Sequence, residues 1–129
     1  MRTLRNIVVF LLLSICLLVP GCNSTKGRLE GLVSVGPLTP VERIGVPTST
    51  PPPEVFTSRG IKILNSLGIL VTEIHFAANG TYSVELIPGK YRVELLGNGI
   101  EHAKELPATI EIFSNETTIL NISIDTGIR

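Results

Sequence analysis

The chain has 129 residues and carries 11 basic and 11 acidic side chains, so its formal net charge is zero. A chain of this length holds one domain with one hydrophobic core and is too short for two ordinary domains. Its charges are interspersed without a basic stripe, which argues against a nucleic-acid partner, because phosphate neutralisation needs a basic face.

The first 22 residues have the pattern of an export signal that ends in a cysteine. Arg2 and Arg5 precede an apolar run of about 13 residues, 7–19, which is shorter than the roughly 20 residues that a membrane-spanning helix needs. A Val-Pro-Gly box precedes Cys22, and the leader resembles a bacterial lipoprotein signal, in which a small residue precedes the cysteine. The resemblance implies removal of residues 1–21 and lipidation of Cys22.

Cysteine usage favours the same interpretation. Cys16 would be removed with the leader, so Cys22 would be the single cysteine of the mature chain. A lone exported cysteine is lipidated, paired between chains or free, and simple secretion or an uncleaved anchor stay open as alternatives. We expect a diacylglycerol and an acyl chain such as palmitate on Cys22, because stable anchoring needs more than one lipid chain. Residues 22–27 would then tether the domain to the cell membrane or, in a two-membrane bacterium, to the outer membrane.

The segment after the tether predicts a strand followed by a long loop. A strand is expected over residues 28–35, where Gly31 marks a bulge or a close approach of another backbone. Six of the nine prolines fall within residues 36–53. Proline has no N–H to donate to a sheet ladder, so this stretch is predicted to be a Pro-rich surface loop.

Two strands are expected next, over residues 55–64 and 69–76, with a turn at residues 65–68 between them. The second of these strands has apolar residues of both parities at its start. Either both of its faces are buried there, or a bulge near Thr72 switches the phase.

Two short turn motifs punctuate the following segment. Asn79-Gly80 fits a type I′ hairpin turn, because both central residues of that turn need positive φ. Pro88-Gly89 fits the central positions of a type II turn. The residues on either side of Pro88-Gly89 alternate strictly between apolar and polar, so both flanks are predicted to be half-buried strands.

The remaining chain predicts a loop at residues 97–107 and strands over residues 109–113 and 117–124. Alternation along the strands from Thr81 onward gives a set of side chains expected to face inward: Tyr82, Val84, Leu86, Tyr91, Val93, Leu95, Ile110, Ile112, Leu120, Ile122 and Ile124. Roughly seven short strands in about 100 residues predict an antiparallel sandwich.

Residues 79–93 read Asn-Gly-Thr-Tyr-Ser-Val-Glu-Leu-Ile-Pro-Gly-Lys-Tyr-Arg-Val. This run resembles the carboxypeptidase regulatory-like, or transthyretin-like, domain, and the similarity extends over residues 27–124. The resemblance implies an all-β, seven-stranded antiparallel Greek-key sandwich over residues 28–126, with an accessory, non-enzymatic role. The family commonly has an acidic residue in the turn where this chain has Ala77 and Ala78, so the resemblance carries no metal site to that turn.

The sequence offers no convincing catalytic, cofactor-binding or metal-binding group. It has two histidines, His75 and His102. His102 lies with Glu101 and Glu105 in what we expect to be a solvated loop, because a metal site needs three or four rigidly held ligands. An enzyme would need both histidines and an arginine to meet within about 4 Å in a cleft.

These observations predict a non-enzymatic, membrane-anchored envelope lipoprotein that presents a structural or binding sandwich. The alternative is a secreted or anchored module that binds a carbohydrate or protein of the envelope through residues 36–53 and 97–107, and a small hydrolase is a distant third. The chain lacks tryptophan, which disfavours a sugar-stacking platform. An exposed apolar or aromatic patch at one loop end would favour the binding module.

Overall fold

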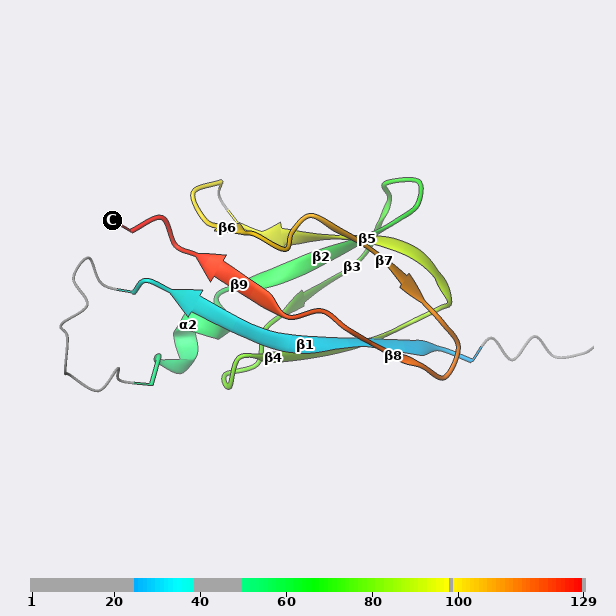
Figure 1. Cartoon of the computed structure of the whole chain (residues 1–129), viewed down its shortest axis with the longest axis horizontal. Coiled ribbons are helices and arrows are strands. Elements are labelled where there is room, and N and C mark those ends of the chain that lie inside the picture. The colour runs from blue at the N-terminus through cyan, green and yellow to red at the C-terminus, as the bar shows by residue number, and fades with distance from the viewer. Residues whose placement is uncertain (1–24, 39–49, 98, 129) are drawn as a thin grey trace, which may run out of the picture.

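The computed structural model describes residues 25–38, 50–97 and 99–128, and within them two β-sheets pack face to face (Figure 1). The first sheet has the order β4-β1-β9-β6, with β8 also paired to β1, and the second has the order β3-β2-β5-β7. The strands of the first sheet are β1 (Gly27–Gly36), β4 (Thr81–Leu86), β6 (His102–Ala103), β8 (Thr117–Ile119) and β9 (Ile122–Asp125). Those of the second are β2 (Gly60–Asn65), β3 (Leu70–His75), β5 (Gly89–Leu96) and β7 (Ala108–Ile112). The expected all-β, two-sheet sandwich is thus confirmed.

The prediction of seven antiparallel strands is wrong in two respects. Nine strands are described, because the expected strand 117–124 is split into β8 and β9, and the expected loop 97–107 contains β6. In addition, β1 runs antiparallel to β4 but parallel to β8 and β9. All four strands of the second sheet lie between β1 and β8 in the sequence. Apolar alternation does not indicate in which direction the later strands run beside β1.

A short helix, α2 (Pro53–Thr57), replaces the start of the strand predicted over residues 55–64. Proline is favoured in the first turn of a helix, and the acidic Glu54 in the same turn suits the positive end of the helix dipole. The ring of Phe56 is buried in the core, so the helix covers one end of the sandwich. The strand itself begins at Gly60.

The segment around Asn79-Gly80 connects the two sheets, so the predicted type I′ hairpin is wrong. β3 lies in the second sheet and β4 in the first. The N–H of Gly80 donates to the Ala77 carbonyl at 2.9 Å, and the N–H of Ala77 donates to the Thr81 carbonyl at 2.8 Å. Gly80 has φ of 74°, whereas Asn79 is not among the positive-φ residues, so only one of the two has the conformation that a type I′ turn requires.

Pro88-Gly89 also joins the two sheets, leading from β4 to β5. Gly89 has φ of 157°, far from the value near +80° of a type II turn, so this turn prediction is also wrong. By contrast, the turn at residues 65–68 is confirmed, because the Gly68 N–H donates to the Asn65 carbonyl at 2.9 Å.

The register between β2 and β3 contains the irregularity that the mixed parity indicated. Ile63 pairs with Thr72, but Leu64 pairs with Leu70, so Val71 is an extra residue on β3. The bulge expected near Thr72 is therefore confirmed, and it confines regular pairing to the second half of β3.

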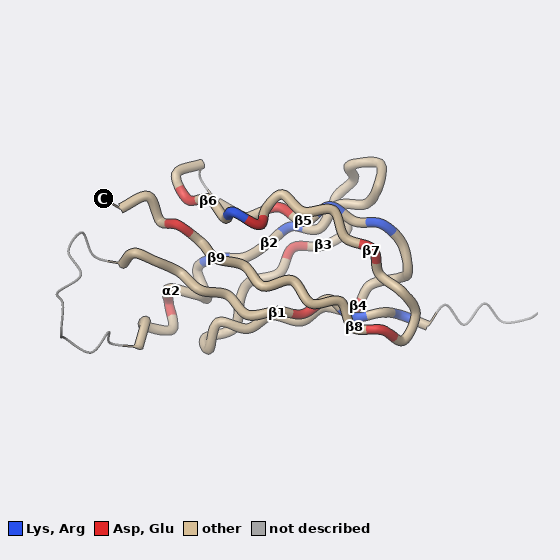
Figure 2. The backbone as a smooth tube through the Cα atoms, in the orientation of Figure 1, with Lys and Arg blue, Asp and Glu red and all other residues tan. Residues whose placement is uncertain are grey.

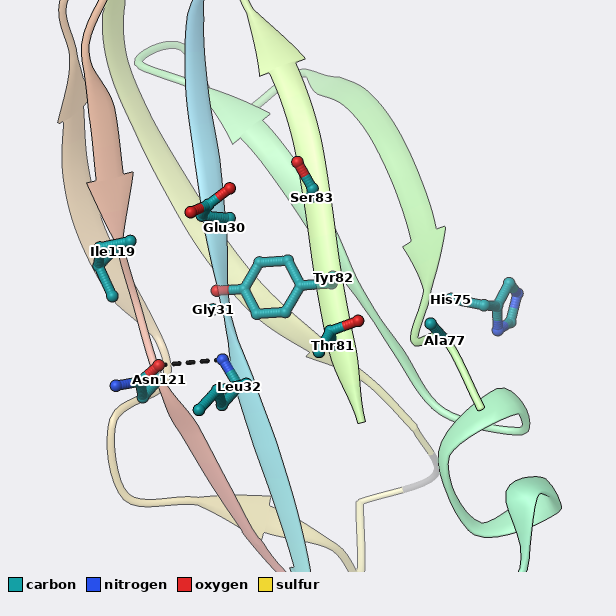
Figure 3. A pocket seen from close by; sticks show the side chains of 10 residues that line it. All are labelled: Glu30, Gly31, Leu32, His75, Ala77, Thr81, Tyr82, Ser83, Ile119 and Asn121. Carbon is teal, nitrogen blue, oxygen red and sulfur yellow. Dashed lines mark hydrogen bonds between the residues drawn. The ribbon is translucent and has the colours of Figure 1, made fainter. Parts of the chain in front are cut away.

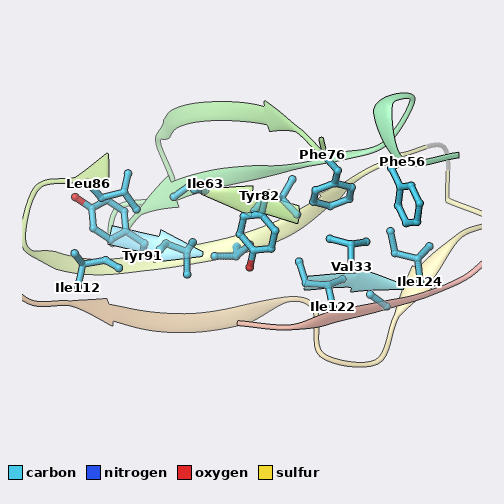
Figure 4. Close-up of a cluster of buried hydrophobic side chains, with 14 residues drawn as sticks. Val33, Phe56, Ile63, Phe76, Tyr82, Leu86, Tyr91, Ile112, Ile122 and Ile124 are labelled. Carbon is cyan, nitrogen blue, oxygen red and sulfur yellow. The ribbon is translucent and has the colours of Figure 1, made fainter. Parts of the chain in front are cut away.

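The core contains the side chains that alternation placed inside from Tyr82 onward, with seven additions (Figure 4). Seven predicted members are buried: Tyr82, Leu86, Tyr91, Val93, Ile112, Ile122 and Ile124. Four others pack against them half-buried: Val84, Leu95, Ile110 and Leu120. The seven additions are Leu29, Val33, Phe56, Ile61, Ile63, Phe76 and Ala103.

Cys22, the leader and residues 39–49 of the Pro-rich loop lie outside the described residues. Within the described ranges, no helix has the length and apolar character needed to cross a membrane.

Candidate binding groove

An open groove of about 780 Å³ lies beside β1 and β4 (Figure 3). It follows the solvent-facing side of the first sheet toward the sheet edge formed by β4. Its lining combines aliphatic, hydroxyl, amide and carboxylate side chains: Glu30, Gly31, Leu32, His75, Ala77, Thr81, Tyr82, Ser83, Ile119 and Asn121.

Gly31 has no side chain, so the backbone of Leu120, which lies between β8 and β9, can approach β1 closely. A Cβ on Gly31 would lie 2.0 Å from the Leu120 carbonyl oxygen and 3.0 Å from a ring carbon of Tyr82. The Tyr82 hydroxyl donates a hydrogen bond to the same Leu120 oxygen. The close backbone approach expected at Gly31 is therefore confirmed. Burial raises the pKa of the Tyr82 phenol, so the hydroxyl stays protonated and keeps its role as a donor.

The Asn121 side chain supplies a hydrogen-bond acceptor to β1 between the end of β8 and the start of β9. Its side-chain Oδ1 accepts a hydrogen bond from the Leu32 N–H at 2.9 Å, in place of a backbone carbonyl. One residue earlier, the Leu120 N–H donates to the Glu30 carbonyl at 2.9 Å. These hydrogen bonds connect the floor of the groove to the β8–β9 segment. Asn121 was not among the expected functional residues, although a polar amide within an otherwise apolar strand is the signal that could have indicated it.

Two aliphatic side chains give the groove an apolar surface. Leu32 is 62% exposed and Ile119 is 59% exposed, and both line the groove. The hydroxyls of Thr81 and Ser83 stand on the adjacent strand. The aromatic ring of Tyr82 is only 5% exposed, so the groove offers no open aromatic face for stacking.

The sandwich end near α2 is held by an ion pair between residues far apart in the sequence. The guanidinium of Arg59 forms a two-pronged contact with the Glu101 carboxylate, in which Nε lies 3.0 Å from Oε2. Arg59 Nη1 also donates to the Val55 carbonyl at 2.6 Å. The Arg59 and Glu101 side chains are 18% and 24% exposed. Each charge is satisfied by the other, so the pair holds the backbone at Glu101 near α2.

The two histidines do not form a catalytic cluster. His75 is exposed at the end of β3, where it is one of the residues that line the groove (Figure 3). His102 is exposed on β6, with Nε2 3.8 Å from a carboxylate oxygen of Asp125. Within residues 25–38, 50–97 and 99–128, no hydrogen bond or ion pair joins one histidine to the other or to an arginine.

The acidic neighbours of His102 have other partners. Glu101 binds Arg59, and the Glu105 carboxylate accepts the Ser123 N–H at 3.0 Å, which lowers the pKa of Glu105. No group of three or more His, Cys, Asp or Glu side chains in the described part of the chain is arranged to hold a metal ion.

Charges elsewhere are spread over the molecule with alternating sign (Figure 2). On the second sheet, Glu94 lies 3.0 Å from the Lys62 ammonium and 2.8 Å from Arg92 Nε. The hydrogen bond from Lys62 is the main cause that lowers the pKa of Glu94. This arrangement is typical of a solvated sheet face.

No family model matches the chain, and no curated protein is similar to it in sequence. The resemblance of residues 79–93 to the carboxypeptidase regulatory-like family therefore stays a prediction.

Solved structures show similarity in fold. The minor pilin GBS52 of Streptococcus agalactiae superposes with a TM-score of 0.53 at 13% identity, covering 78% of this chain and 44% of the pilin. The Bacillus anthracis TIE protein gives a TM-score of 0.53 at 18% identity, covering 78% of this chain and 17% of that protein. A DUF3823 family protein from Parabacteroides merdae gives 0.47 at 15% identity, covering 79% of this chain and 47% of its own. The chain thus spans less than half the length of these proteins, and the first two share its β-sandwich fold.

Proposed function

We propose that the chain is an exported, non-enzymatic binding module, anchored to a membrane through lipidated Cys22, that holds a protein partner in the groove beside β1 and β4. The leader and the lone mature cysteine support the anchor. One protein that shares the fold is described as a minor pilin of a Gram-positive bacterium, which agrees with an exported role.

The observation that carries the binding role is the exposed pair Leu32 and Ile119 on a face that is otherwise polar. A solvated sheet face alternates with polar side chains, so aliphatic side chains more than half exposed on that face are available for a partner. The rigid floor made by Gly31, Tyr82 and Asn121 would lower the entropy lost on binding. A protein is favoured over a carbohydrate because Tyr82, the aromatic residue of the groove, is buried.

The groove is tested by placing a photo-crosslinking amino acid at Leu32 or Ile119 of the full chain in its native cell. Leu67, which is 81% exposed on the turn between β2 and β3, is the matched control position. We expect one discrete protein adduct from Leu32 and from Ile119 and none of that size from Leu67. Equal adducts from all three positions would mean that the groove has no specific partner.

The anchor is tested by replacing Cys22 with alanine. The variant is expected to stay uncleaved or to leave the membrane, because lipid attachment and cleavage both depend on the thiol. A correctly cleaved Cys22→Ala chain that still partitions into the detergent phase would contradict lipid anchoring.

The non-enzymatic role is tested by changing both histidines to glutamine. Each side chain is exposed and lies apart from an arginine, so the double variant is expected to keep its cellular role and its abundance. Loss of that role in a normally folded double variant would reveal an imidazole-dependent site and would contradict the proposal.

A further inference from the structure

One edge of β3 is unpaired among the described strands, because β3 ends the second sheet. The N–H of Phe76 donates to the Arg59 carbonyl at 3.0 Å, and the following pairs are Gly60 with His75 and Ile61 with Ile74. In an antiparallel ladder, successive residues direct their backbone groups to opposite edges. The N–H and C=O groups of Glu73 and His75 therefore point to the free edge of β3.

This edge lacks the features that usually block pairing with another strand, such as lysine, proline or an inward-facing charge. Leu70 and Val71 at its start are 50% and 46% exposed. Ile74 faces the core and is only half-buried, since no strand covers its outer side. The charged or ionisable side chains of β3 are Glu73 and His75, which are both exposed on the outward face.

We propose that the partner of this edge is β3 of a second copy of the chain, paired antiparallel about a two-fold axis at Ile74. In this register Glu73 of each copy lies opposite His75 of the other, and each such pair exchanges both backbone hydrogen bonds. The two Ile74 side chains face each other on the core side. The two four-stranded sheets become one continuous sheet.

Side-chain complementarity favours this register. A two-fold axis at Glu73 would place two carboxylates opposite each other, which is destabilising across a strand pair, whereas an axis at Ile74 places each carboxylate beside an imidazole that can donate a ring N–H to it. On the neighbouring strand Lys62 pairs with Glu73 in register, but its ammonium is held by Glu94 at 3.0 Å. Gly60, opposite His75, has no side chain. Within the described part of the chain, the Glu73 carboxylate makes no hydrogen bond or ion pair, so it is free to meet the second copy.

The register is tested by disulfide crosslinking of the full chain in intact cells. Ile74→Cys is expected to form a covalent dimer under mild oxidation, because non-hydrogen-bonded antiparallel neighbours have a Cα separation suited to a disulfide. Thr109→Cys on β7, the opposite edge of the same sheet, is the matched control and is expected to stay monomeric. The unaltered chain, run in parallel, accounts for any disulfide through Cys22.

Two further sets of variants separate specific pairing from random collision. Adding His75→Glu to Ile74→Cys should abolish the dimer band, because it places two carboxylates opposite each other. Adding Glu73→Lys as well should restore the band, because an ammonium then lies opposite each introduced carboxylate. Because Ile74→Cys removes core volume, a second measurement uses two tagged chains, one with Glu73→Cys and one with His75→Cys. The Glu73→Cys chain should crosslink with the His75→Cys chain, and each chain should crosslink much less with another copy of the same variant.

An absence of crosslinks in both the Ile74→Cys and the mixed experiments, with the chain folded, would overturn the proposal. So would a dimer that ignores the charge reversal, one formed equally by Thr109→Cys, or stronger crosslinking of Glu73→Cys with itself. His75 of the paired edge also lines the groove, but the groove crosslinks start from Leu32 on β1 and Ile119 on β8. A groove adduct of the size of two copies would identify the second copy as the groove's partner, whereas an adduct of another size would leave the two proposals to fail separately.

Discussion

Gly31→Ala is expected to destabilise the domain strongly, because the added methyl group has no space. Its Cβ would lie 2.0 Å from the Leu120 carbonyl oxygen and 2.7 Å from the carbonyl carbon. Ordinary carbon–oxygen contacts lie at about 3.3–3.6 Å, so this backbone would have to retreat by more than ~1 Å. The same oxygen accepts the Tyr82 hydroxyl, and a shift of that size would break the bond.

The magnitude follows from two losses. Forcing a methyl group into a packed interior costs about 1–3 kcal/mol, and leaving the partly buried Tyr82 hydroxyl unpaired costs about 1–3 kcal/mol. The two effects share one displacement, so we expect a total near 3 kcal/mol and not their full sum. Small domains have about 5–15 kcal/mol of stability, so the loss would be readily measured.

The assay is urea unfolding of residues 25–129, with equal slopes required for comparison of the variants. Gly36→Ala is the matched control on the same strand, because nothing lies within 4 Å of its added Cβ, and it should change stability by less than about 0.5 kcal/mol. Tyr82→Phe should cost less in the Gly31→Ala background than alone, since the bond is already broken there. A Gly31→Ala variant as stable as Gly36→Ala would refute the close approach between β1 and the β8–β9 segment.

Three further predictions concern other parts of the fold. Gly80→Val should destabilise by roughly 1–3 kcal/mol in urea unfolding, because a β-branched residue resists the φ of 74° at this turn, and an unchanged stability would contradict that conformation. The hydrogen bond from the Ser123 N–H lowers the pKa of Glu105 in the folded state, so it stabilises the fold at pH values above the unfolded-state pKa of Glu105, and this stabilisation is lost as the pH falls through the folded-state pKa. Glu105→Gln should therefore reduce the loss of unfolding free energy in acid. An identical dependence of stability on pH in the variant would exclude the contact. Arg59→Ala should lower the free energy of unfolding by about 2 kcal/mol, because it leaves Glu101 unpaired. Glu101→Ala should then cost much less stability in the Arg59→Ala background than in the unaltered chain. Additive losses of stability would show that the two side chains are not coupled.

The sequence could predict the strands and the side of each strand that is buried, because alternation depends only on local geometry. Tyr82 and Leu86 on β4, and Tyr91 and Val93 on β5, all lie in the core as alternation predicted. Alternation does not say which sheet a strand joins. The segment around Gly80 was therefore expected to be a hairpin within one sheet, although it connects the two sheets.

The groove was less predictable, because it depends on residues brought together from distant segments. Gly31 could be recognised as a point of close approach, but its partner Leu120 lies near the other end of the chain. The Asn121 side chain takes the place of a backbone acceptor because the strand is interrupted between β8 and β9. That interruption is defined by how the two strands pair with β1, a distant segment of the chain. Similarly, neither Arg59 nor Glu101 stands in a local motif that indicates the ion pair.

The central claim, that the groove beside β1 holds a protein partner, is tested most directly by measuring affinity for the protein captured by crosslinking at Leu32. After that protein is identified and purified, its dissociation constant is measured by calorimetry with the unaltered domain and with Leu32→Arg, Ile119→Arg and Leu67→Arg. The account predicts at least about tenfold weaker binding for the two groove variants, equivalent to about 1.4 kcal/mol, and unchanged binding for Leu67→Arg. Equal affinity for all four proteins, with each domain folded, would show that the partner binds elsewhere and would contradict the account.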